Sequence, residues 1–294
     1  MQYKRKSSQI VFDTLNTIFM VLIGVACLYP FYYIFIYSIS DSLEAAKGIA
    51  FLPKNPTLAN YTMIFQDSNI INSFFVSAAR TVLGAGITVL CSAFLAYLFT
   101  NPLLPMRKGL YKFVIITMYL SSGLIPWYVT MSAYGLKNKF LLYILPSAVN
   151  AFFMILIKTY MESLPAALSE SAELDGAGIF ALFFQVILPL CLPVIAAVAV
   201  FAAVGQWNSW SDNLFLVKAP ELKTLQLTLY EYFQSAAPSV ENMRDAAASM
   251  SKRTVTLSSI RMSIAVVTVI PIFAVYPFMM RFFVKGIMLG AVKG

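Results

Sequence analysis

Histidine is absent from the 294 residues of this sequence, and charged residues make up only 12% of them. The lack of histidine removes the commonest metal ligand and the commonest general base. The sequence has three cysteines, and each lies inside an apolar run: Cys27, Cys91 and Cys191. Neither a disulfide framework nor a thiolate metal site is therefore predicted, and no catalytic or metal-binding residues are expected.

The sequence also lacks a phosphate-binding loop of the form Gly-x-x-x-x-Gly-Lys-Ser/Thr. That loop cradles the phosphates of a bound nucleotide, so its absence argues against ATP binding by this chain. If transport here uses ATP, we expect another polypeptide to bind the nucleotide and its Mg²⁺. The chain by itself is not predicted to be an enzyme or to hold a cofactor.

Hydrophobic residues fill 60% of the sequence, far above their share in a soluble domain. We therefore predict a polytopic membrane protein, with residues 1–294 forming a single transmembrane domain. The longest polar stretch, about residues 210–258, is too short for a core of its own and is predicted to be a partly ordered outward loop. The net charge of +8 is attributed to basic membrane ends that face anionic lipid, so nucleic acid is not expected as a partner.

Six apolar segments are long enough to cross a membrane as α-helices. They cover about residues 10–39, 73–99, 110–131, 140–160, 183–204 and 259–283. Pro30 is expected to kink the first helix, and Pro271 and Pro277 the last one. An even number of spans places both chain termini on one side of the membrane.

The second apolar segment contains small residues and one cation. Its small residues, which let a neighbouring helix approach closely, are Gly84, Gly86, Ser92 and Ala93. Two interpretations of Arg80 are open. Its charged head reaches the membrane interface, which is the favoured interpretation, or it lines a polar cavity.

Basic residues indicate which side of the membrane is cytoplasmic. The cluster Lys4-Arg5-Lys6, the turn Arg107-Lys108 and the pair Arg281 and Lys285 all fall on one side, as the positive-inside rule requires of the cytoplasm. Lys137 and Lys139 fall on the opposite side and weaken the signal. We expect both termini to be cytoplasmic.

An amphipathic stretch, about residues 162–182, lies between the fourth and fifth segments. It predicts two short helices joined at Asp175-Gly176, because glycine permits a turn too tight for larger side chains. The apolar residues that can share one side of this hairpin are Leu164, Leu168, Ala172 and Leu174. The residues expected to face water are Glu170, Glu173 and Asp175.

The hairpin carries a motif with long spacing. Glu170-Ser171-Ala172 is followed four residues later by Gly176, and Leu188-Pro189 comes behind them. This pattern resembles the cytoplasmic coupling signature of permease subunits of binding-protein-dependent ABC importers, and residues 170–177 are similar to its carbohydrate branch. Ser171 stands where alanine is usual and Val186 where isoleucine is usual, and both changes are small.

The resemblance implies an all-α transmembrane bundle of six helices, of the type I ABC importer permease kind, in the bacterial inner membrane. It assigns coupling to a separate ATPase to Glu170, Ser171, Ala172, Asp175 and Gly176. The implied partners are a second, homologous permease, two ATPase subunits that bind ATP and Mg²⁺, and an extracytoplasmic solute-binding protein. This chain would form half of the pathway.

The C-terminal residues are similar to those of a subgroup of these permeases. The residues that carry the similarity are Tyr276-Pro277-Phe278, Arg281-Phe282-Phe283, Val284-Lys285-Gly286 and residues 290–294. The subgroup handles oligosaccharides, including acidic ones cut from alginate and pectin. The resemblance therefore implies import of an oligosaccharide, whose identity the sequence does not fix.

A stretch rich in aromatic and amide groups, residues 206–213, follows the fifth segment. Such groups suit sugars, which present apolar ring faces and outward hydroxyls. Trp207 and Trp210 are interpreted equally well as sugar contacts or as anchors at the membrane interface, and Asn208 is favoured slightly as a cavity residue. Weaker candidates for the substrate path are Asn150 and Tyr119.

Two other function classes fit the sequence less well. An ion-coupled secondary transporter of small polar solutes would need ionisable groups in the spans, and apart from Arg80 the spans contain almost none. An intramembrane enzyme would need a catalytic constellation that the sequence does not offer. Uptake that depends on ATP rather than on an ion gradient would separate the importer from the secondary transporter.

Overall fold

The computed structural model describes residues 7–49, 51–234 and 255–291, which form helices joined by turns and loops. Three expectations fall outside these residues: the basic cluster Lys4-Arg5-Lys6, the alanine-rich piece 246–248 of the predicted loop, and the end of the C-terminal similarity at 292–294. The chain divides into two compact units. The first is made of residues up to Asp67 with Tyr232–Val269, and the second of Ser68–Glu231 with the residues from Ile270 on.

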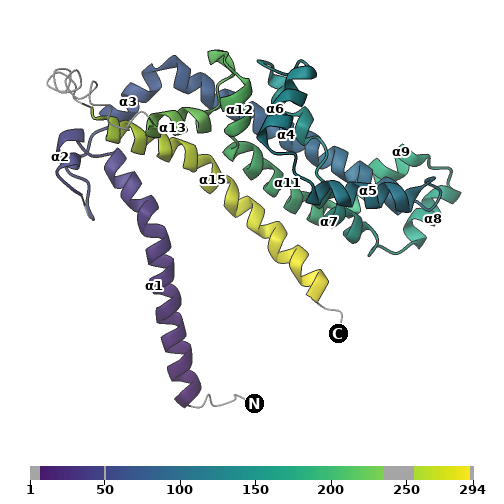
Figure 1. Ribbon diagram of the computed structural model, residues 1–294. Helices are drawn as coiled ribbons and strands as arrows, with labels where there is room; N and C mark the ends of the chain where they lie inside the picture. The colour runs from purple at the N-terminus through teal and green to yellow at the C-terminus, as the bar shows by residue number, and fades with distance from the viewer. Residues whose placement is uncertain (1–6, 50, 235–254, 292–294) are drawn as a thin grey trace. The chain divides into compact units, whose positions relative to one another are not determined.

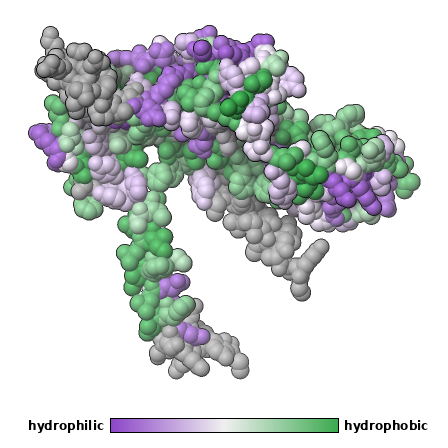
Figure 2. All heavy atoms as spheres, in the orientation of Figure 1, coloured by the Kyte–Doolittle hydropathy of each residue, from purple (hydrophilic) through white to green (hydrophobic). Residues whose placement is uncertain are grey.

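The first unit begins with helix α1 (Ser7–Ser38), which matches the first predicted span (Figure 1). The apolar part of α1 that is long enough to span a membrane is not buried inside the protein. The face of the helix that Figure 2 shows is mostly apolar. Pro30 lies inside the helix without ending it. Because exposing so much apolar surface to water is unfavourable, we expect α1 to contact lipid or another membrane helix.

Two short helices follow in the predicted loop, α2 (Ser42–Ala46) and α3 (Ala59–Gln66). They are joined through Asn60, whose side chain is fully buried. Its Nδ2 donates to the carbonyl oxygens of Ser38 (2.8 Å) and Ser40 (3.1 Å), and its Oδ1 accepts from the Ser42 hydroxyl (2.8 Å). One amide therefore ties the end of α1 to α2 and α3.

Helix α15 (Leu257–Ala291) contains the last predicted span, 259–283, and supplies residues to both units. Pro271 and Pro277 lie inside it. Arg281 and Lys285, which were expected just past its end, lie within it instead.

The second unit is organised around α4 (Ser68–Thr100), which begins five residues before the predicted span at 73–99. It packs against α11 (Leu192–Asn208) and α7 (Ala151–Met161), as Figure 1 shows. The small residues Gly84, Ser92 and Ala93 are buried in α4 as predicted, whereas Gly86 is exposed. Small side chains at this interface let the helix backbones approach closely.

The third predicted span, 110–131, is wrong as a single helix. It is divided into α5 (Arg107–Tyr119) and α6 (Leu124–Ala133), with a non-helical break before α6. Gly123 in that break has φ +78°, a conformation that glycine adopts without strain. The apolar run alone did not reveal this break.

The fourth and fifth predicted spans, 140–160 and 183–204, are also broken. The fourth consists of 3₁₀ turns η1 (Phe140–Tyr143) and η2 (Leu145–Ser147) followed by α7, with a bend of 47° between Phe140–Ser147 and α7. The fifth is bent by 84° at Cys191, between Ile179–Leu190 and α11. Pro193 lies in the first turn of α11, where its missing N–H is tolerated.

The segment before this bend contains α9 (Ile179–Ala181), the π-helix η3 (Leu182–Ile187) and α10 (Leu188–Leu190). The predicted outward loop is partly helical, with α12 (Ser211–Leu216), η4 (Pro220–Leu222) and α13 (Leu225–Gln234). By length and composition, the described residues contain three helices able to cross a membrane, or up to five if each bent pair is one span.

Asn60→Ala is expected to destabilise the first unit, because it leaves two carbonyl groups and one hydroxyl without their buried partner. The cost should be about 1–3 kcal/mol. Thermal unfolding of the solubilised protein measures it. The control is Thr62→Ala in the same helix, whose exposed hydroxyl donates to the Ala59 carbonyl. Equal melting temperatures for the two variants would contradict this role.

Candidate functional site

A cavity of about 350 Å³ opens within the second unit, where α4, η1, η2, α7, α11 and α12 meet. Aromatic side chains form part of its wall, from Trp127, Phe153 and Phe201. The remaining wall is largely polar and includes Arg80, Asn150, Gln206, Ser209 and Asp212. Aromatic faces beside hydrogen-bonding groups are the surface that a sugar ring requires.

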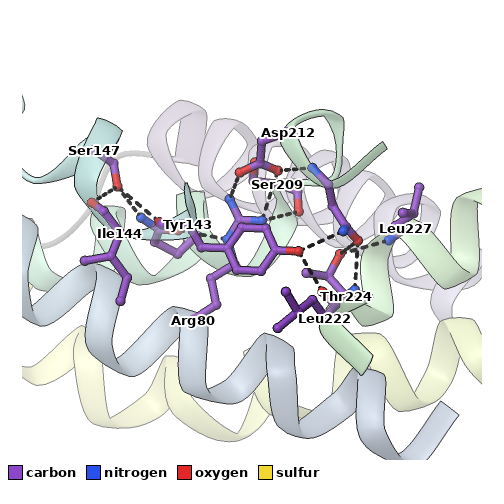
Figure 3. Close-up of polar contacts among 11 residues, drawn as sticks. Arg80, Tyr143, Ile144, Ser147, Ser209, Asp212, Leu222, Thr224 and Leu227 are labelled. Atoms are coloured by element: carbon purple, nitrogen blue, oxygen red, sulfur yellow. Dashed lines mark hydrogen bonds and ion pairs between the residues drawn. The ribbon is translucent and has the colours of Figure 1, made fainter. Parts of the chain in front are cut away.

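An ion pair lies in this wall (Figure 3). Arg80, on α4, donates from Nη1 to Oδ1 of Asp212 at 3.0 Å and from Nη2 to Oδ2 at 2.5 Å. The arginine side chain is only 4% exposed and the aspartate side chain 13%. The favoured expectation that Arg80 reaches the membrane interface is therefore wrong, and the other interpretation, a cavity residue, describes its position.

Three further contacts fix the guanidinium group. Its Nε donates to Oε1 of Gln206 (3.0 Å), and Nη1 also donates to the carbonyl oxygen of Ser209 (3.3 Å). The ring of Tyr143 lies under the guanidinium carbon at 4.5 Å from the ring centroid, within the range of a cation–π interaction. Arg80 therefore connects α4 to η1 and to the end of α11.

Gln206 connects the same elements from the other side. Its Nε2 donates to the Ser147 hydroxyl (2.7 Å), and Thr88 donates to the Ser147 carbonyl (2.7 Å). The Gln206 side chain lies across Gly84, where an added Cβ would come within 2.7 Å of Gln206 Cδ. Only glycine leaves room for the glutamine to keep both hydrogen bonds.

A second buried group continues the network toward the predicted outward loop. The Tyr143 hydroxyl accepts from Asn213 Nδ2 (2.7 Å) and donates to the Leu222 carbonyl (2.6 Å). Asn213 Oδ1 accepts from the backbone N–H (2.9 Å) and the hydroxyl (3.1 Å) of Thr224. The segment that follows α12 is thereby fastened to the cavity wall (Figure 3).

The predicted substrate-path residues fall in different places. Asn150 lines the cavity and also caps α7, accepting from the Phe153 N–H at 3.1 Å. Trp207 is buried with its ring edge against Phe74, and Trp210 stacks on Tyr230 at 4.2 Å between centroids.

The other two candidates are exposed. Asn208 donates to the Val204 carbonyl of its own helix, and Tyr119, the last residue of α5, is 77% exposed. Of the five residues chosen from the sequence for the substrate path, the cavity wall contains Asn150 alone.

The cavity residues not chosen from the sequence include Gln206, Ser209 and Asp212, together with Tyr143 and Ser147. The first three belong to the stretch 206–213, which was predicted to contact sugar. The region was therefore predicted correctly, but the residues chosen within it were the tryptophans instead of these three. Tyr143 and Ser147 gave no signal, because they lie in a span whose break was not predicted. Among the described residues, no group of three or more His, Cys, Asp or Glu side chains could hold a metal ion.

The predicted hairpin is present as α8 (Ala167–Leu174), a turn at Gly176 with φ +83°, and α9. Leu164, Ala172 and Ala177 pack against the core of the second unit, and both short helices contact η3. Glu170, Ser171, Asp175 and Gly176 are exposed.

Two apolar residues of the hairpin differ from expectation. Leu168 was expected on the sheltered side with Leu164 and Ala172 but is 37% exposed, and Leu174, expected there too, is 89% exposed. Leu174 directly precedes Asp175 at the tip of the hairpin, so the outer surface there combines an apolar side chain with acidic ones. An exposed apolar side chain beside acidic groups is typical of a surface that binds another protein.

Gly84→Ala is expected to displace Gln206 and so weaken its bonds to Arg80 and Ser147, at a cost of about 1–3 kcal/mol. The control is Gly86→Ala in the same helix, where an added Cβ meets nothing within 4 Å. Thermal unfolding in detergent compares the two. The explanation by close packing would be contradicted if Gly84→Ala had the melting temperature of the wild type. It would also be contradicted if Gly84→Ala lowered the melting temperature as much in a Gln206→Ala background as in the wild type.

Comparisons with known proteins place the chain in a family. No protein-family model matches it. It is 31% identical over 285 residues to the polygalacturonan/rhamnogalacturonan transport system permease protein YtcP of Bacillus subtilis, covering 97% of this chain and 99% of that one. It is 33% identical over 285 residues to the Bacillus subtilis protein LplC, covering 97% and 95%.

A solved structure agrees with these relatives. A chain of a bacterial ABC transporter involved in the import of the acidic polysaccharide alginate matches with a TM-score of 0.87 and 26% identity, over 96% of this chain and 100% of that one. The predicted all-α membrane fold and importer function are thus confirmed, and a permease subunit is not itself catalytic. The chain belongs to the family of carbohydrate ABC importer permeases.

Proposed function

We propose that this chain forms half of an oligosaccharide pathway and receives the motion of a separate ATPase through the hairpin α8–α9. The observation that carries the proposal is the two-sided character of the hairpin. Its inner side is anchored on the core by Leu164, Ala172 and Ala177, while Glu170 and Asp175 are exposed on its outer side. A rigid knob of this kind transmits a push from a partner to the helices beneath it.

The connection from the hairpin to the cavity supports this role. Both α8 and α9 pack on η3, which leads through α10 and the 84° bend at Cys191 into α11. Helix α11 ends at Asn208 and carries Gln206, whose side chain bonds to Arg80 in the cavity wall. A displacement of the hairpin therefore reaches the cavity through one continuous segment of chain. π-Helical turns such as η3 are often found where a helix must adjust for function.

The ATPase partner is expected to present basic and apolar groups to the hairpin. Glu170 would pair with a cation of that partner, Ser171 and Ala172 keep the contact small, and Gly176 permits the turn before α9. Two such ATPase subunits would bind ATP and Mg²⁺. A second permease would supply the other half of the pathway, and an extracytoplasmic solute-binding protein would deliver the sugar to the outward loop, about residues 210–258.

The membrane setting follows from the same assembly. Coupling to a cytoplasmic ATPase would require the hairpin to lie on the cytoplasmic side of the bacterial inner membrane, and we propose the same side for both termini. The exposed apolar surface of α1 would be covered by lipid or by the second permease.

The substrate class is suggested by the relatives. Polygalacturonan is a polymer of a uronic acid, and alginate is named as an acidic polysaccharide in the solved transporter. We therefore propose an acidic oligosaccharide as the cargo. Trp127, Phe153 and Phe201 give the cavity the aromatic faces against which sugar rings stack.

Glu170→Arg and Gly176→Trp are expected to release the ATPase from this chain while leaving the second permease bound. The first reverses the charge of the contact and the second blocks the turn. The measurement is a pull-down of the gently solubilised chain, followed by identification of the retained subunits.

Glu221→Arg is the matched control, since Glu221 is an exposed acidic residue of η4, far from the hairpin in sequence. It should retain both partners. The coupling proposal would be overturned if the two hairpin variants retained the ATPase as the wild type does, or if the wild type transported sugar without any ATPase attached.

A further inference from the structure

We propose that Arg80 is the carboxylate-binding residue of the cavity, and that a uronate carboxylate of the cargo takes the place of Asp212 on its guanidinium group. This inference rests on the proposed import of acidic oligosaccharides. In this inference, the ion pair between Arg80 and Asp212 is what distinguishes acidic from neutral sugars.

The guanidinium is held in place by groups that carry no negative charge. Gln206 accepts from Nε, the Ser209 carbonyl accepts from Nη1, and the Tyr143 ring lies beneath the group. These contacts would remain if Asp212 moved away. Arg80 would then present a fixed planar fork with two parallel donors, the geometry that binds a carboxylate in a bidentate manner.

Asp212 occupies that fork in the structure and shows how a carboxylate sits there. Its oxygens lie 3.0 Å and 2.5 Å from Nη1 and Nη2 of Arg80 (Figure 3). A uronate carboxylate has the same charge and the same pair of oxygens. It can therefore replace the aspartate without leaving a buried cation unpaired, which would be strongly unfavourable.

Asp212 has other partners to retain after such an exchange. Its Oδ1 also accepts from the backbone N–H of Asn213 (2.8 Å) and from the Ser209 hydroxyl (3.3 Å), both close to it in the chain. Its side chain is 13% exposed and lines the cavity, whereas that of Arg80 is 4% exposed. The aspartate is thus the member of the pair that can turn toward water, while the arginine stays fixed.

The composition of the cavity wall points to the same residue. Arg80 and Asp212 are the charged residues among those that line it. Among the residues that the structure describes, an acidic sugar entering this space therefore meets a single cation. A neutral sugar offers hydroxyl groups that can bond to the polar wall but cannot displace a carboxylate from arginine, so it leaves the ion pair intact.

The test is equilibrium binding to the complex purified with its partner subunits in detergent, without the solute-binding protein. Trp127 lines the cavity, so tryptophan fluorescence can report occupancy. The probes are an α-1,4-linked galacturonate trimer and the galactose trimer of the same linkage, which differ only in carboxylate against alcohol. The variants are Asp212→Asn, which removes the competing charge, and Arg80→Lys, which keeps the cation but loses the fork.

The wild type should bind the galacturonate trimer more tightly than the galactose trimer. Asp212→Asn should lower the Kd of the galacturonate trimer by about tenfold, and Arg80→Lys should raise it by about tenfold, both with little effect on the galactose trimer. Arg80→Lys retains a partner for Asp212, so it decides the matter even if Asp212→Asn does not assemble.

Equal binding of the two trimers by the wild type, or equal shifts for both in the variants, would overturn the inference and show that the pair only supports the wall. ATP-dependent oligosaccharide uptake would still stand in that case. If neither trimer binds while uptake of galacturonate oligomers proceeds, the cavity is not the recognition site and the inference falls alone. If uptake of every oligosaccharide is also absent, the proposed function falls with it.

Discussion

A buried ion pair, Arg80 with Asp212, is the interaction on which the second unit of the structure depends. Without Asp212 or another carboxylate, the buried Arg80 would be an uncompensated charge, and leaving one partner of such a pair unpaired typically costs about 3–5 kcal/mol. The pair therefore obliges α4, η1, the end of α11 and α12 to meet at one place. The cavity lies where they meet, so the same charges that hold the wall together face whatever enters it.

The rest of the second unit can be understood from that meeting point outward. Gly84 allows Gln206 to lie against α4, and Gln206 in turn bonds to both Arg80 and Ser147. From Gln206 the chain runs back along α11 to the bend at Cys191 and then to the π-helical turn on which the hairpin rests. The hairpin and the cavity are two ends of one segment, as the proposed coupling to an ATPase requires.

The sequence predicted the long uninterrupted helices α1 and α4 to within about five residues at each end, because a continuous apolar run of that length has few alternatives in a membrane. It also predicted the start of α15, but that helix continues to Ala291, past the predicted end at residue 283. It also located the hairpin, since Gly176 and its acidic neighbours form a local pattern. It did not predict the breaks at Gly123, before Asn150 and at Cys191, because apolar composition is the same on both sides of each break.

The cavity residues illustrate the same limit. Arg80 stood out as the cation of an apolar segment, yet its partner lies 132 residues further along the chain, and no local rule connects the two. Because the sequence does not reveal the ion pair with Asp212, the simpler interpretation was that the Arg80 side chain extends to the membrane interface. The tryptophans of the stretch 206–213 were chosen for their chemistry, whereas packing turned Trp207 toward Phe74 and left the cavity to Gln206 and Asp212.

The central claim, that this chain moves an acidic oligosaccharide by coupling to an ATPase, is tested most directly by uptake of galacturonate oligomers into proteoliposomes that contain the complete complex and its binding protein. ATP should be required on the side of the hairpin, and uptake should persist when ionophores collapse all ion gradients. Uptake that proceeds without ATP and stops with the gradients would contradict the claim.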